Sequence, residues 1–165
     1  MKRRPILISM ALAALPGISC AVQTKTLLTV SGSIGRINNK TTGAFEFSEA
    51  EFLKLPTVSI TTGTAWTPTS VFVGPLLDDV MHAAGVTAGT LTLKALDDYS
   101  TLIPWDDLKR YGVIMAHTQD GQRLNNQRWG PLWIIYPRDQ NAAELKGPIA
   151  ESRFVWQVDR IEVSG

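Results

Sequence analysis

The chain has 165 residues, which is enough for one ordinary domain and too few for two comfortable ones. Hydrophobic residues make up 44% of the chain and charged residues 19%, a composition that is typical of a folded globular protein and excludes general disorder. The charges of the 16 basic and 15 acidic residues almost cancel. Residues 1–21 hold three basic and no acidic residues, so the net charge of the remaining chain is near −2. The excess of basic residues that nucleic-acid binding requires is therefore absent.

The first 21 residues have the three parts of a secretory signal peptide. A charged start, Lys2-Arg3-Arg4, precedes an apolar stretch over residues 6–15, and small residues allow cleavage after Ala21. The apolar stretch is shorter than the about 20 residues that span a bilayer, and no stretch of spanning length follows it. We therefore expect export to the periplasm, one folded domain over residues 22–165, and no membrane-spanning segment.

Cys20 is the only cysteine, so an internal disulfide bond is excluded. Two interpretations of it are open. Cleavage after Ala21 removes it with the leader, whereas cleavage just before it would leave it as the site of a lipid anchor. Gly17 stands where lipoproteins usually have leucine, so we favour removal. The domain then has no thiolate for catalysis or for binding a metal.

The rest of the chain is divided into short elements by glycine, proline, asparagine and aspartate residues. Alternating or β-branched stretches predict about eight strands. In chain order these are residues 26–31, 44–47, 57–62, 90–95, 99–103, 113–118, 132–136 and 154–163. Asp97-Asp98 predicts a turn that pairs 90–95 with 99–103, and Asp120-Gly121 predicts a hairpin.

Three short helices are predicted between these strands, over residues 48–55, 75–84 and 104–111. Ser48 and Glu51 form a capping box at the start of the first helix. Glycines follow the other two and end them, because glycine readily adopts the left-handed conformation of a helix stop. Residues 138–152 are expected to form a polar loop. Strands and a few short helices together predict a mixed, β-rich α+β domain.

Six phrases between residues 73 and 163 occur in the order and spacing of a known family. They are Gly74-Pro75-Leu76-Leu77 with Gly85, Ala95-Leu96-Asp97-Asp98-Tyr99, Ile103-Pro104, Asp120-Gly121-Gln122-Arg123-Leu124, residues 129–137 and residues 154–163. Together they resemble the molybdopterin-binding domain of sulfite oxidase and related oxidoreductases. The resemblance implies a sulfite-oxidase-like fold with a pocket for a heterocycle.

The chain departs from that family where the enzymes bind their metal. In the enzymes a cysteine of the loop before the 75–84 helix binds molybdenum, whereas the loop over residues 61–67 contains threonines and one tryptophan here. A threonine hydroxyl is a poor substitute for a soft thiolate. Trp133 also replaces the arginine of the family's phrase, which removes a phosphate partner. We therefore expect no molybdenum and no certain cofactor, with a pterin as a candidate ligand.

The 61–67 loop, the Asp98-Tyr99 turn and the 130–137 phrase are also similar to those of a branch of stand-alone, exported proteins with this fold. Some members of that branch resemble periplasmic pterin-binding proteins that report to inner-membrane enzymes of cyclic-di-GMP metabolism. The resemblance implies two partners for this chain, a pterin-like small molecule and an inner-membrane sensor protein.

The candidate ligand-binding residues come from three segments. They are Thr62, Thr64 and Trp66 in the loop, Asp98 and Tyr99 in the turn, and Arg128 and Trp129 before the 132–136 strand. A pterin ring can stack on a tryptophan such as Trp66, and a carboxylate such as Asp98 can accept two hydrogen bonds from its amino-pyrimidine edge. Each segment also has a structural alternative, as a polar surface loop, a solvated turn or core aromatics.

Two other kinds of site lack their residue pattern. His82 and His117 have no carboxylate or thiol at metal-ligand spacing, and no G-x-S-x-G turn is present for a serine hydrolase. We therefore expect no catalytic residues and no metal ligands.

Three hypotheses of function stay open. The first is an exported pterin-binding module that modulates an inner-membrane signalling enzyme. The second is a reduced-size molybdopterin-dependent oxidoreductase, and the third is an interaction domain that uses no ligand.

Overall fold

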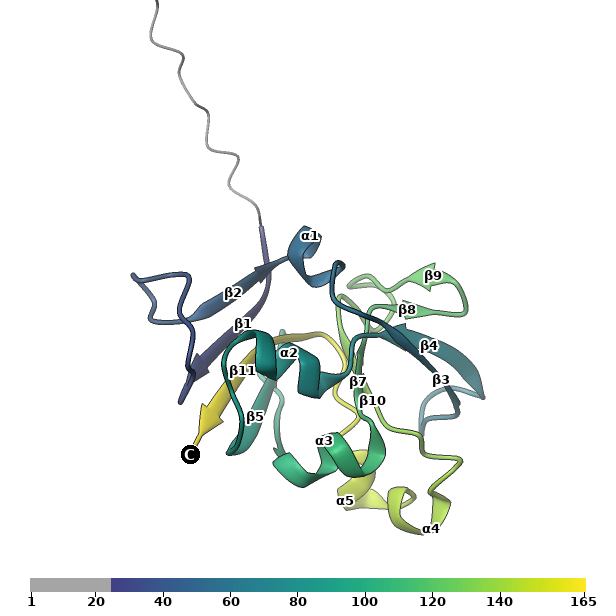
Figure 1. Cartoon of the computed structure of the whole chain (residues 1–165). Helices are drawn as coiled ribbons and strands as arrows, with labels where there is room; N and C mark the ends of the chain where they lie inside the picture. The colour runs from purple at the N-terminus through teal and green to yellow at the C-terminus, as the bar shows by residue number, and fades with distance from the viewer. Residues whose placement is uncertain (1–24) are drawn as a thin grey trace, which may run out of the picture.

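A computed structural model describes residues 25–165, which form three β-sheets and five short helices (Figure 1). The signal peptide, its cleavage site and Cys20 lie outside these residues. No helix in the described part of the chain is both long and apolar enough to cross a membrane. The mixed α+β fold class is confirmed, with more short strands and two more helices than the sequence pattern predicts.

The largest sheet has the strand order β2-β1-β11-β5-β6. Its strands are β1 (Thr26–Gly32), β2 (Phe45–Ser48), β5 (Thr90–Ala95), β6 (Ser100–Pro104) and β11 (Val158–Ser164). The first and last strands of the described chain, β1 and β11, run parallel, with Val30 opposite Ile161. The predicted pairing across Asp97-Asp98 is confirmed, because β5 and β6 form an antiparallel hairpin.

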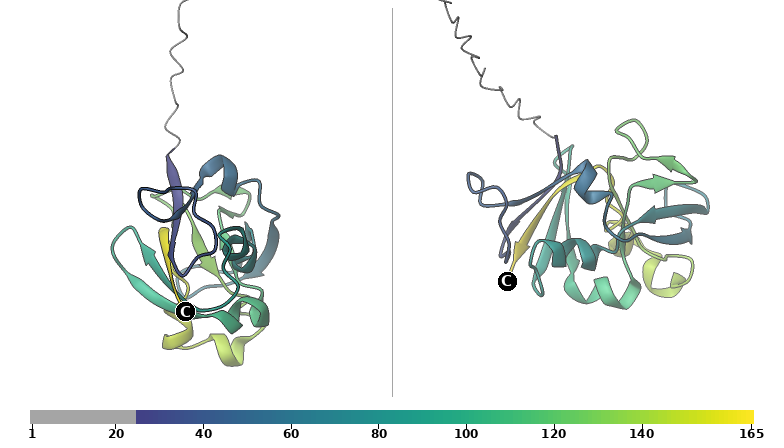
Figure 2. Two further views of the ribbon diagram at one scale, coloured as in Figure 1. Left: turned by 60° about the vertical axis from the view of Figure 1, so that its left-hand side comes forward. Right: turned by 45° about the horizontal axis from the view of Figure 1, so that its top comes forward.

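The two smaller sheets lie on the other side of the molecule. The four-stranded sheet has the order β3-β4-β8-β9 and the two-stranded sheet pairs β10 with β7. Their strands are β3 (Val58–Thr62), β4 (Ser70–Gly74), β7 (Ile114–Ala116), β8 (Thr118–Gln119), β9 (Gln122–Arg123) and β10 (Trp133–Ile135). In Figure 1, β7 and β10 lie between the two larger sheets, and Figure 2 shows the molecule from two further directions. Gly74 permits the close approach of β4 to β7, since a Cβ atom there would collide with the Met115 carbonyl.

The three predicted helices are present and two more follow them. The five are α1 (Glu49–Phe52), α2 (Leu77–Ala83), α3 (Trp105–Tyr111), α4 (Ala142–Leu145) and α5 (Pro148–Glu151). The capping box of α1 is confirmed: the Glu51 amide donates to the Ser48 hydroxyl at 3.3 Å and the Ser48 amide donates to the Glu51 carboxylate at 2.9 Å. Gly112 ends α3 in the left-handed region, with φ of 61°.

Several predicted boundaries are wrong. Residues 138–152 are not all loop, because α4 and α5 lie there, and single turns of helix leave no periodic pattern in a sequence. The predicted strand 113–118 is two strands, β7 and β8, which separate at His117. The predicted strand 154–163 begins only at Val158, since Gln157 before it has a left-handed φ of 56° that no strand accommodates.

Both faces of the segment 132–136 belong to the core. Every side chain from Leu132 to Tyr136 is fully buried. Elements pack on both faces of β10: Phe72 of β4 contacts Trp133 edge-on at 5.4 Å between ring centroids, and Tyr111 of α3 contacts Tyr136 at 5.9 Å. Strand β10 is therefore the centre of the hydrophobic core, and its aromatic residues are core residues.

One buried charged group links this core to the helices. Asp107 of α3 is 7% exposed, and its Oδ2 accepts a hydrogen bond from the Tyr136 hydroxyl at 3.0 Å. The same oxygen forms an ion pair with Arg153 at 2.7 Å. Burial, reinforced by the negative charge of Asp107, raises the pKa of Tyr136 far above its ordinary value, so that its hydroxyl remains a donor. Asp107 thus ties α3 and β10 to the segment that precedes β11.

We predict that Asp107→Ala lowers the free energy of unfolding by about 2–4 kcal/mol, because it leaves Arg153 and the Tyr136 hydroxyl without their buried partner. Urea unfolding measures the change. The matched control is Asp106→Ala, which removes a neighbouring exposed carboxylate of the same helix and should cost less than about 1 kcal/mol. Equal losses in the two variants would contradict this role for Asp107.

His117 makes stability depend on pH. It is half-buried, its Nε2 has no hydrogen-bond partner among the described residues, and burial, with Arg123 nearby, lowers its pKa below the ordinary value of 6.5. A depressed pKa means that the unfolded chain binds this proton more readily than the folded chain does. The free energy of unfolding is therefore unaffected by this group above about pH 6.5, and it decreases as the pH falls below that value. We expect His117→Asn to have a flatter stability profile than the wild type from about pH 8 to about pH 5 in urea titrations. The control is His82→Asn, which replaces an exposed histidine and should keep the wild-type change of stability with pH.

Candidate functional site

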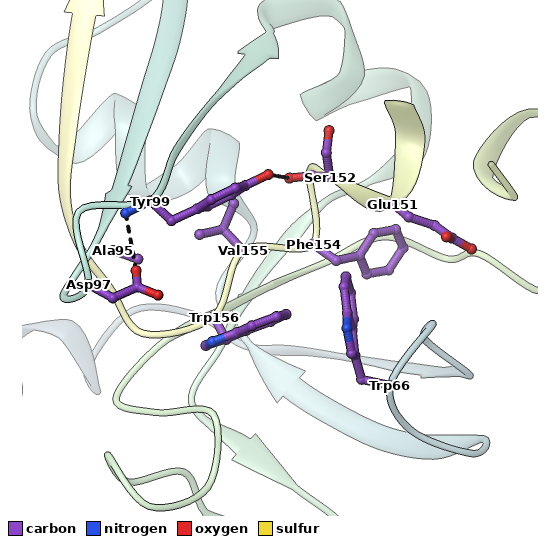
Figure 3. Close-up of a pocket in the computed structure, with 9 residues that line it drawn as sticks. All are labelled: Trp66, Ala95, Asp97, Tyr99, Glu151, Ser152, Phe154, Val155 and Trp156. Carbon is purple, nitrogen blue, oxygen red and sulfur yellow. Dashed lines mark hydrogen bonds between the residues drawn. The ribbon is translucent and has the colours of Figure 1, made fainter. Parts of the chain in front are cut away.

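A pocket opens between the β5–β6 turn and the segment that connects α5 to β11 (Figure 3). Its volume is about 160 Å³ and its walls are mainly apolar. The lining residues are Trp66, Ala95, Asp97, Tyr99, Glu151, Ser152, Phe154, Val155 and Trp156. Three parts of the chain that are distant in sequence therefore form one site.

Aromatic rings surround the cavity. Tyr99 lies on one side and Trp156 on the other, with Val155 behind them and Trp66 beside Trp156 (Figure 3). Trp66 contacts Trp156 edge-on at 4.7 Å between centroids. The Tyr99 hydroxyl donates to the Ser152 carbonyl at 3.1 Å and so connects the two walls. Trp66 and Tyr99 are 43% and 46% exposed, so the slot between the rings is open to solvent.

Two further tryptophans hold Trp156 in place. The rings of Trp129 and Trp156 are 5.0 Å apart, and those of Trp129 and Trp133 are 5.1 Å apart. The indole nitrogen of Trp133 donates to the Phe154 carbonyl at 3.1 Å, within the buried core. One wall of the pocket is therefore fixed by the core, which is the support that a preorganised binding site needs.

Unusual backbone conformations surround the same pocket. Asp98, Trp129 and Gln157 have positive φ angles of 64°, 59° and 56°, which are uncommon for residues other than glycine. The amide of Gln157 donates to the Trp129 carbonyl at 3.2 Å, and the Leu96 amide donates to the Gln157 carbonyl at 3.0 Å. Such strained positions concentrate at functional sites, where the surrounding structure enforces them. Here they set the directions of Tyr99 and Trp156, which follow or precede them.

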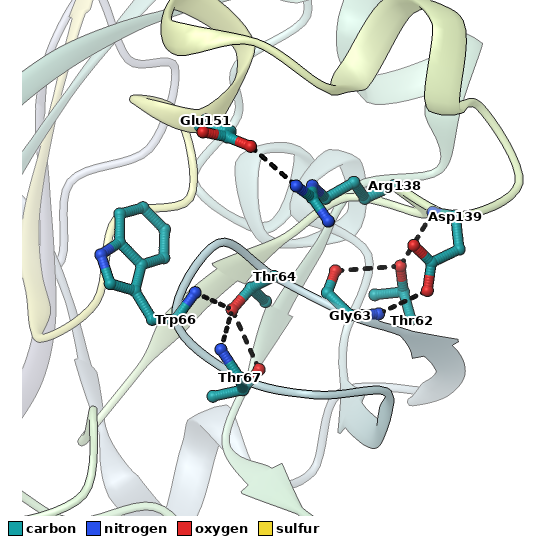
Figure 4. A network of polar contacts seen from close by, with 8 residues as sticks. All are labelled: Thr62, Gly63, Thr64, Trp66, Thr67, Arg138, Asp139 and Glu151. Atoms are coloured by element: carbon teal, nitrogen blue, oxygen red, sulfur yellow. Dashed lines mark hydrogen bonds and ion pairs between the residues drawn. The ribbon is translucent and has the colours of Figure 1, made fainter.

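The loop that carries Trp66 is closed by threonine hydroxyls (Figure 4). The Thr64 hydroxyl accepts hydrogen bonds from the amides of Trp66 at 3.1 Å and Thr67 at 3.0 Å. The Thr62 hydroxyl donates to the Gly63 carbonyl and accepts from the Asp139 amide at 3.0 Å. Thr62 and Thr64 are buried, so they position the loop and lie behind the pocket wall.

The loop is joined to the opposite wall through two charged residues. The Gly63 amide donates to the Asp139 carboxylate at 2.7 Å. The adjacent residue, Arg138, forms an ion pair with Glu151 of α5 at 2.7 Å, with side chains that are only 17% and 27% exposed. Trp66 and Glu151 are therefore connected through one continuous set of contacts.

The structure brings some of the predicted site residues together and separates others. Trp66 and Tyr99 line the pocket, and Trp129 lies behind Trp156. Asp98 points away, with its side chain 91% exposed and paired with Arg160 at 3.3 Å. Its neighbour Asp97 lines the pocket instead, and the Asp97 carboxylate accepts a hydrogen bond from the Tyr99 amide at 3.1 Å.

Arg128 lies at a different hollow, which is polar, has a volume of about 400 Å³ and also touches the other side of Trp129. There Arg128 donates to the Gln122 side-chain oxygen at 2.7 Å. The pocket residues that the sequence analysis did not identify are Ala95, Asp97, Glu151, Ser152, Phe154, Val155 and Trp156. Trp156 carried a signal, as an aromatic residue in the closing phrase, but its assignment to a regular strand hid its role.

The pocket residues do not fit a molybdenum centre. Residues 25–165 contain no cysteine, and within them no group of three or more histidine, cysteine, aspartate or glutamate side chains is placed to hold a metal ion. In the 61–67 loop, the hydroxyl of Thr64 accepts from two amides of its own turn, and the hydroxyl of Thr62 is bonded to Gly63 and Asp139. The donors in this loop are hard hydroxyl oxygens that already make hydrogen bonds, and a hydroxyl is a poor substitute for a soft thiolate ligand.

Comparison with known proteins gives two matches. A family model, the oxidoreductase molybdopterin binding domain, matches residues 36–146. Among solved structures, the crystal structure of the sulfane dehydrogenase SoxCD from Paracoccus pantotrophus is similar, with a TM-score of 0.61 and 15% sequence identity. That match covers 85% of this chain and 38% of the other, and at this identity it shows a shared fold. No curated protein matches the chain.

We predict that Thr64→Val lowers the free energy of unfolding by about 1–2 kcal/mol, because two loop amides lose their acceptor while the side-chain shape is kept. The near-ultraviolet circular dichroism of the protein should decrease at the same time, because the contact between Trp66 and Trp156 depends on that loop. Thr61→Val, on the exposed edge of the same strand, is the matched control. An unchanged spectrum and stability in Thr64→Val would show that the hydroxyl does not hold the loop.

Proposed function

The chain belongs to the oxidoreductase molybdopterin-binding domain family, and from this premise we propose that it binds a free pterin, or a similarly flat heterocycle, in the pocket beside Trp66. The observation that carries the proposal is the open slot with Tyr99 on one side and Trp156 on the other. Aromatic side chains facing each other suit a planar ring, which gains dispersion and stacking energy on both of its faces.

The size of the cavity supports a small ligand. An apolar cavity of about 150 Å³ holds a benzene-sized ring, and the pocket has about 160 Å³ with one open side. A bicyclic ring therefore fits with one edge exposed. A cofactor with a large substituent would extend well outside the walls.

Polar groups at the two ends of the slot supply orientation. The Asp97 carboxylate keeps acceptor capacity beyond its bond to the Tyr99 amide, and it can accept the paired N–H groups of an amino-pyrimidine edge. Asp97 thus takes the part that the sequence pattern gave to Asp98. Glu151 lies at the other side of the pocket, where Arg138 holds it.

A small molybdopterin-dependent oxidoreductase is the second candidate, and the family match is the observation in its favour. The satisfied hydroxyl of Thr64 and the lack of a thiolate in residues 25–165 argue against it. Elemental analysis of protein purified from its host separates the two candidates. Stoichiometric molybdenum would support the oxidoreductase, whereas a co-purifying pterin without metal would support the binding protein.

We propose further that the protein works in the periplasm and conveys pterin binding to an inner-membrane enzyme of cyclic-di-GMP metabolism. The support is the signal-peptide pattern of residues 1–21 and the similarity of the 61–67 loop and the Asp98-Tyr99 turn to exported pterin-binding proteins. Mass spectrometry of the mature N-terminus tests export and distinguishes cleavage after Ala21 from a lipid anchor at Cys20. Signalling that responds to gene deletion but is unchanged by pocket variants at normal protein level would favour a ligand-free interaction domain.

We predict that Trp66→Ala weakens pterin binding by about tenfold or more, because it removes an aromatic ring that lines the open site and packs against Trp156. Isothermal titration calorimetry with reduced and oxidised pterins measures the dissociation constants. Trp105→Ala is the control, since Trp105 is the tryptophan outside the cluster around the pocket and contacts His82 instead. Failure of the folded wild-type protein to bind any pterin would rule out the proposed function.

A further inference from the structure

The charged residues that line the pocket are of one sign, and the cations near it lie behind the lining. Asp97 and Glu151 are the only charged residues among those that line it, so no lysine, arginine or histidine of the described chain contributes to the wall. Two carboxylates therefore border a cavity that is otherwise apolar, that of Asp97 and that of Glu151, which is paired with Arg138 at 2.7 Å. An anionic group on a ligand would meet no cation there.

The arginines that flank the pocket are already paired with carboxylates. Arg138 pairs with Glu151 at 2.7 Å, and Arg153 pairs with Asp107 at 2.7 Å in the core. Arg160 lies between Asp98 at 3.3 Å and Asp159 at 3.1 Å. To bind an anion, any of these arginines would have to leave its partner.

Leaving those partners is costly where the groups are shielded from water. The side chains of Arg138 and Glu151 are 17% and 27% exposed, and those of Arg153 and Asp107 are 24% and 11% exposed. Breaking such a pair leaves a carboxylate without a partner in a partly dry environment. Repulsion between a phosphate and the wall carboxylates adds to this cost.

The two ends of the pocket bring a substituent on a bound ring close to a carboxylate. The hydrogen bond from the Tyr99 hydroxyl to the Ser152 carbonyl closes one side of the cavity. Asp97 and Glu151 lie at opposite ends of the lining, as Figure 3 shows. A side chain that leaves the slot at either of these ends therefore passes one carboxylate or the other.

From these observations we propose that the pocket selects pterins by charge: it takes an unphosphorylated, neutral or cationic heterocycle and rejects the phosphorylated form of the same ring. The inference rests on the proposed function, because it names the class of ligand for that site. Molybdopterin, after which the family is named, carries a phosphate and falls in the rejected class. The site thus differs from a cofactor site in charge as well as in its lack of a thiolate.

A matched pair of ligands tests the proposal. Dihydroneopterin and dihydroneopterin monophosphate share one ring and differ by the phosphate. We expect the full-length mature protein to bind the phosphorylated form at least about tenfold more weakly in calorimetric titrations. The ratio should decrease as salt is added, since screening weakens repulsion between partly exposed charges.

Charge-neutralising variants show whether the two carboxylates cause the discrimination. In Asp97→Asn/Glu151→Gln the ratio of the two dissociation constants should fall to near one, whatever the absolute affinity for the unphosphorylated ring. The control Glu144→Gln/Glu162→Gln removes two exposed carboxylates that pair with Arg110 and Lys94 and do not line the pocket. It should keep the wild-type ratio.

The possible outcomes separate the two proposals. Equal binding of both ligands by the wild type, or an unchanged ratio in Asp97→Asn/Glu151→Gln, would overturn charge selection and leave pterin binding intact. Binding of neither ligand, nor of any other pterin, would overturn the proposed function and this inference with it.

Discussion

The pocket depends on the burial of one indole ring, that of Trp133. Strand β10 places it at the centre of the core, where it is fully buried and packs on Phe72 and Trp129. Its N–H group donates to the Phe154 carbonyl, and a buried donor of this kind strongly favours a conformation that satisfies it. The segment from Phe154 to Trp156 is therefore fixed against the core, and the apolar wall of the site is fixed with it. The same residue occupies the position where the family phrase has an arginine, so one substitution replaces a charge at the site with a structural support.

The sequence was informative wherever a local rule determines the structure. The capping box of Ser48 and Glu51, the hairpin across Asp97-Asp98 and the glycine stop after α3 all follow from interactions within a few residues, and all are present. It was less informative wherever distant contacts decide. Gln157 is left-handed because its amide and carbonyl bond to Trp129 and Leu96, and nothing in the neighbouring sequence indicates this. The choice between Asp97 and Asp98 is similar, since both suit a turn and only the tertiary arrangement shows which one faces the cavity.

Family membership and site chemistry lead to different conclusions about this chain. The chain has the fold of an oxidoreductase molybdopterin-binding domain, while its loop hydroxyls hold the loop together and the charged residues that line its pocket are acidic. A fold does not determine a function, because function depends on the groups that a particular chain places in the cavity. The groups placed here are aromatic rings and carboxylates, which can recognise a planar molecule and provide no ligand set for a soft metal.

The parallel pairing of β1 with β11 has a consequence for how the chain acquires its structure. The two central strands of the largest sheet come from opposite ends of the described sequence, so the sheet lacks its middle until residues 158–164 are available. Contacts of such large sequence separation are slow to form and cannot guide folding of a nascent chain. The largest sheet can therefore close only at a late step of folding, after strands from both ends of the described sequence are present.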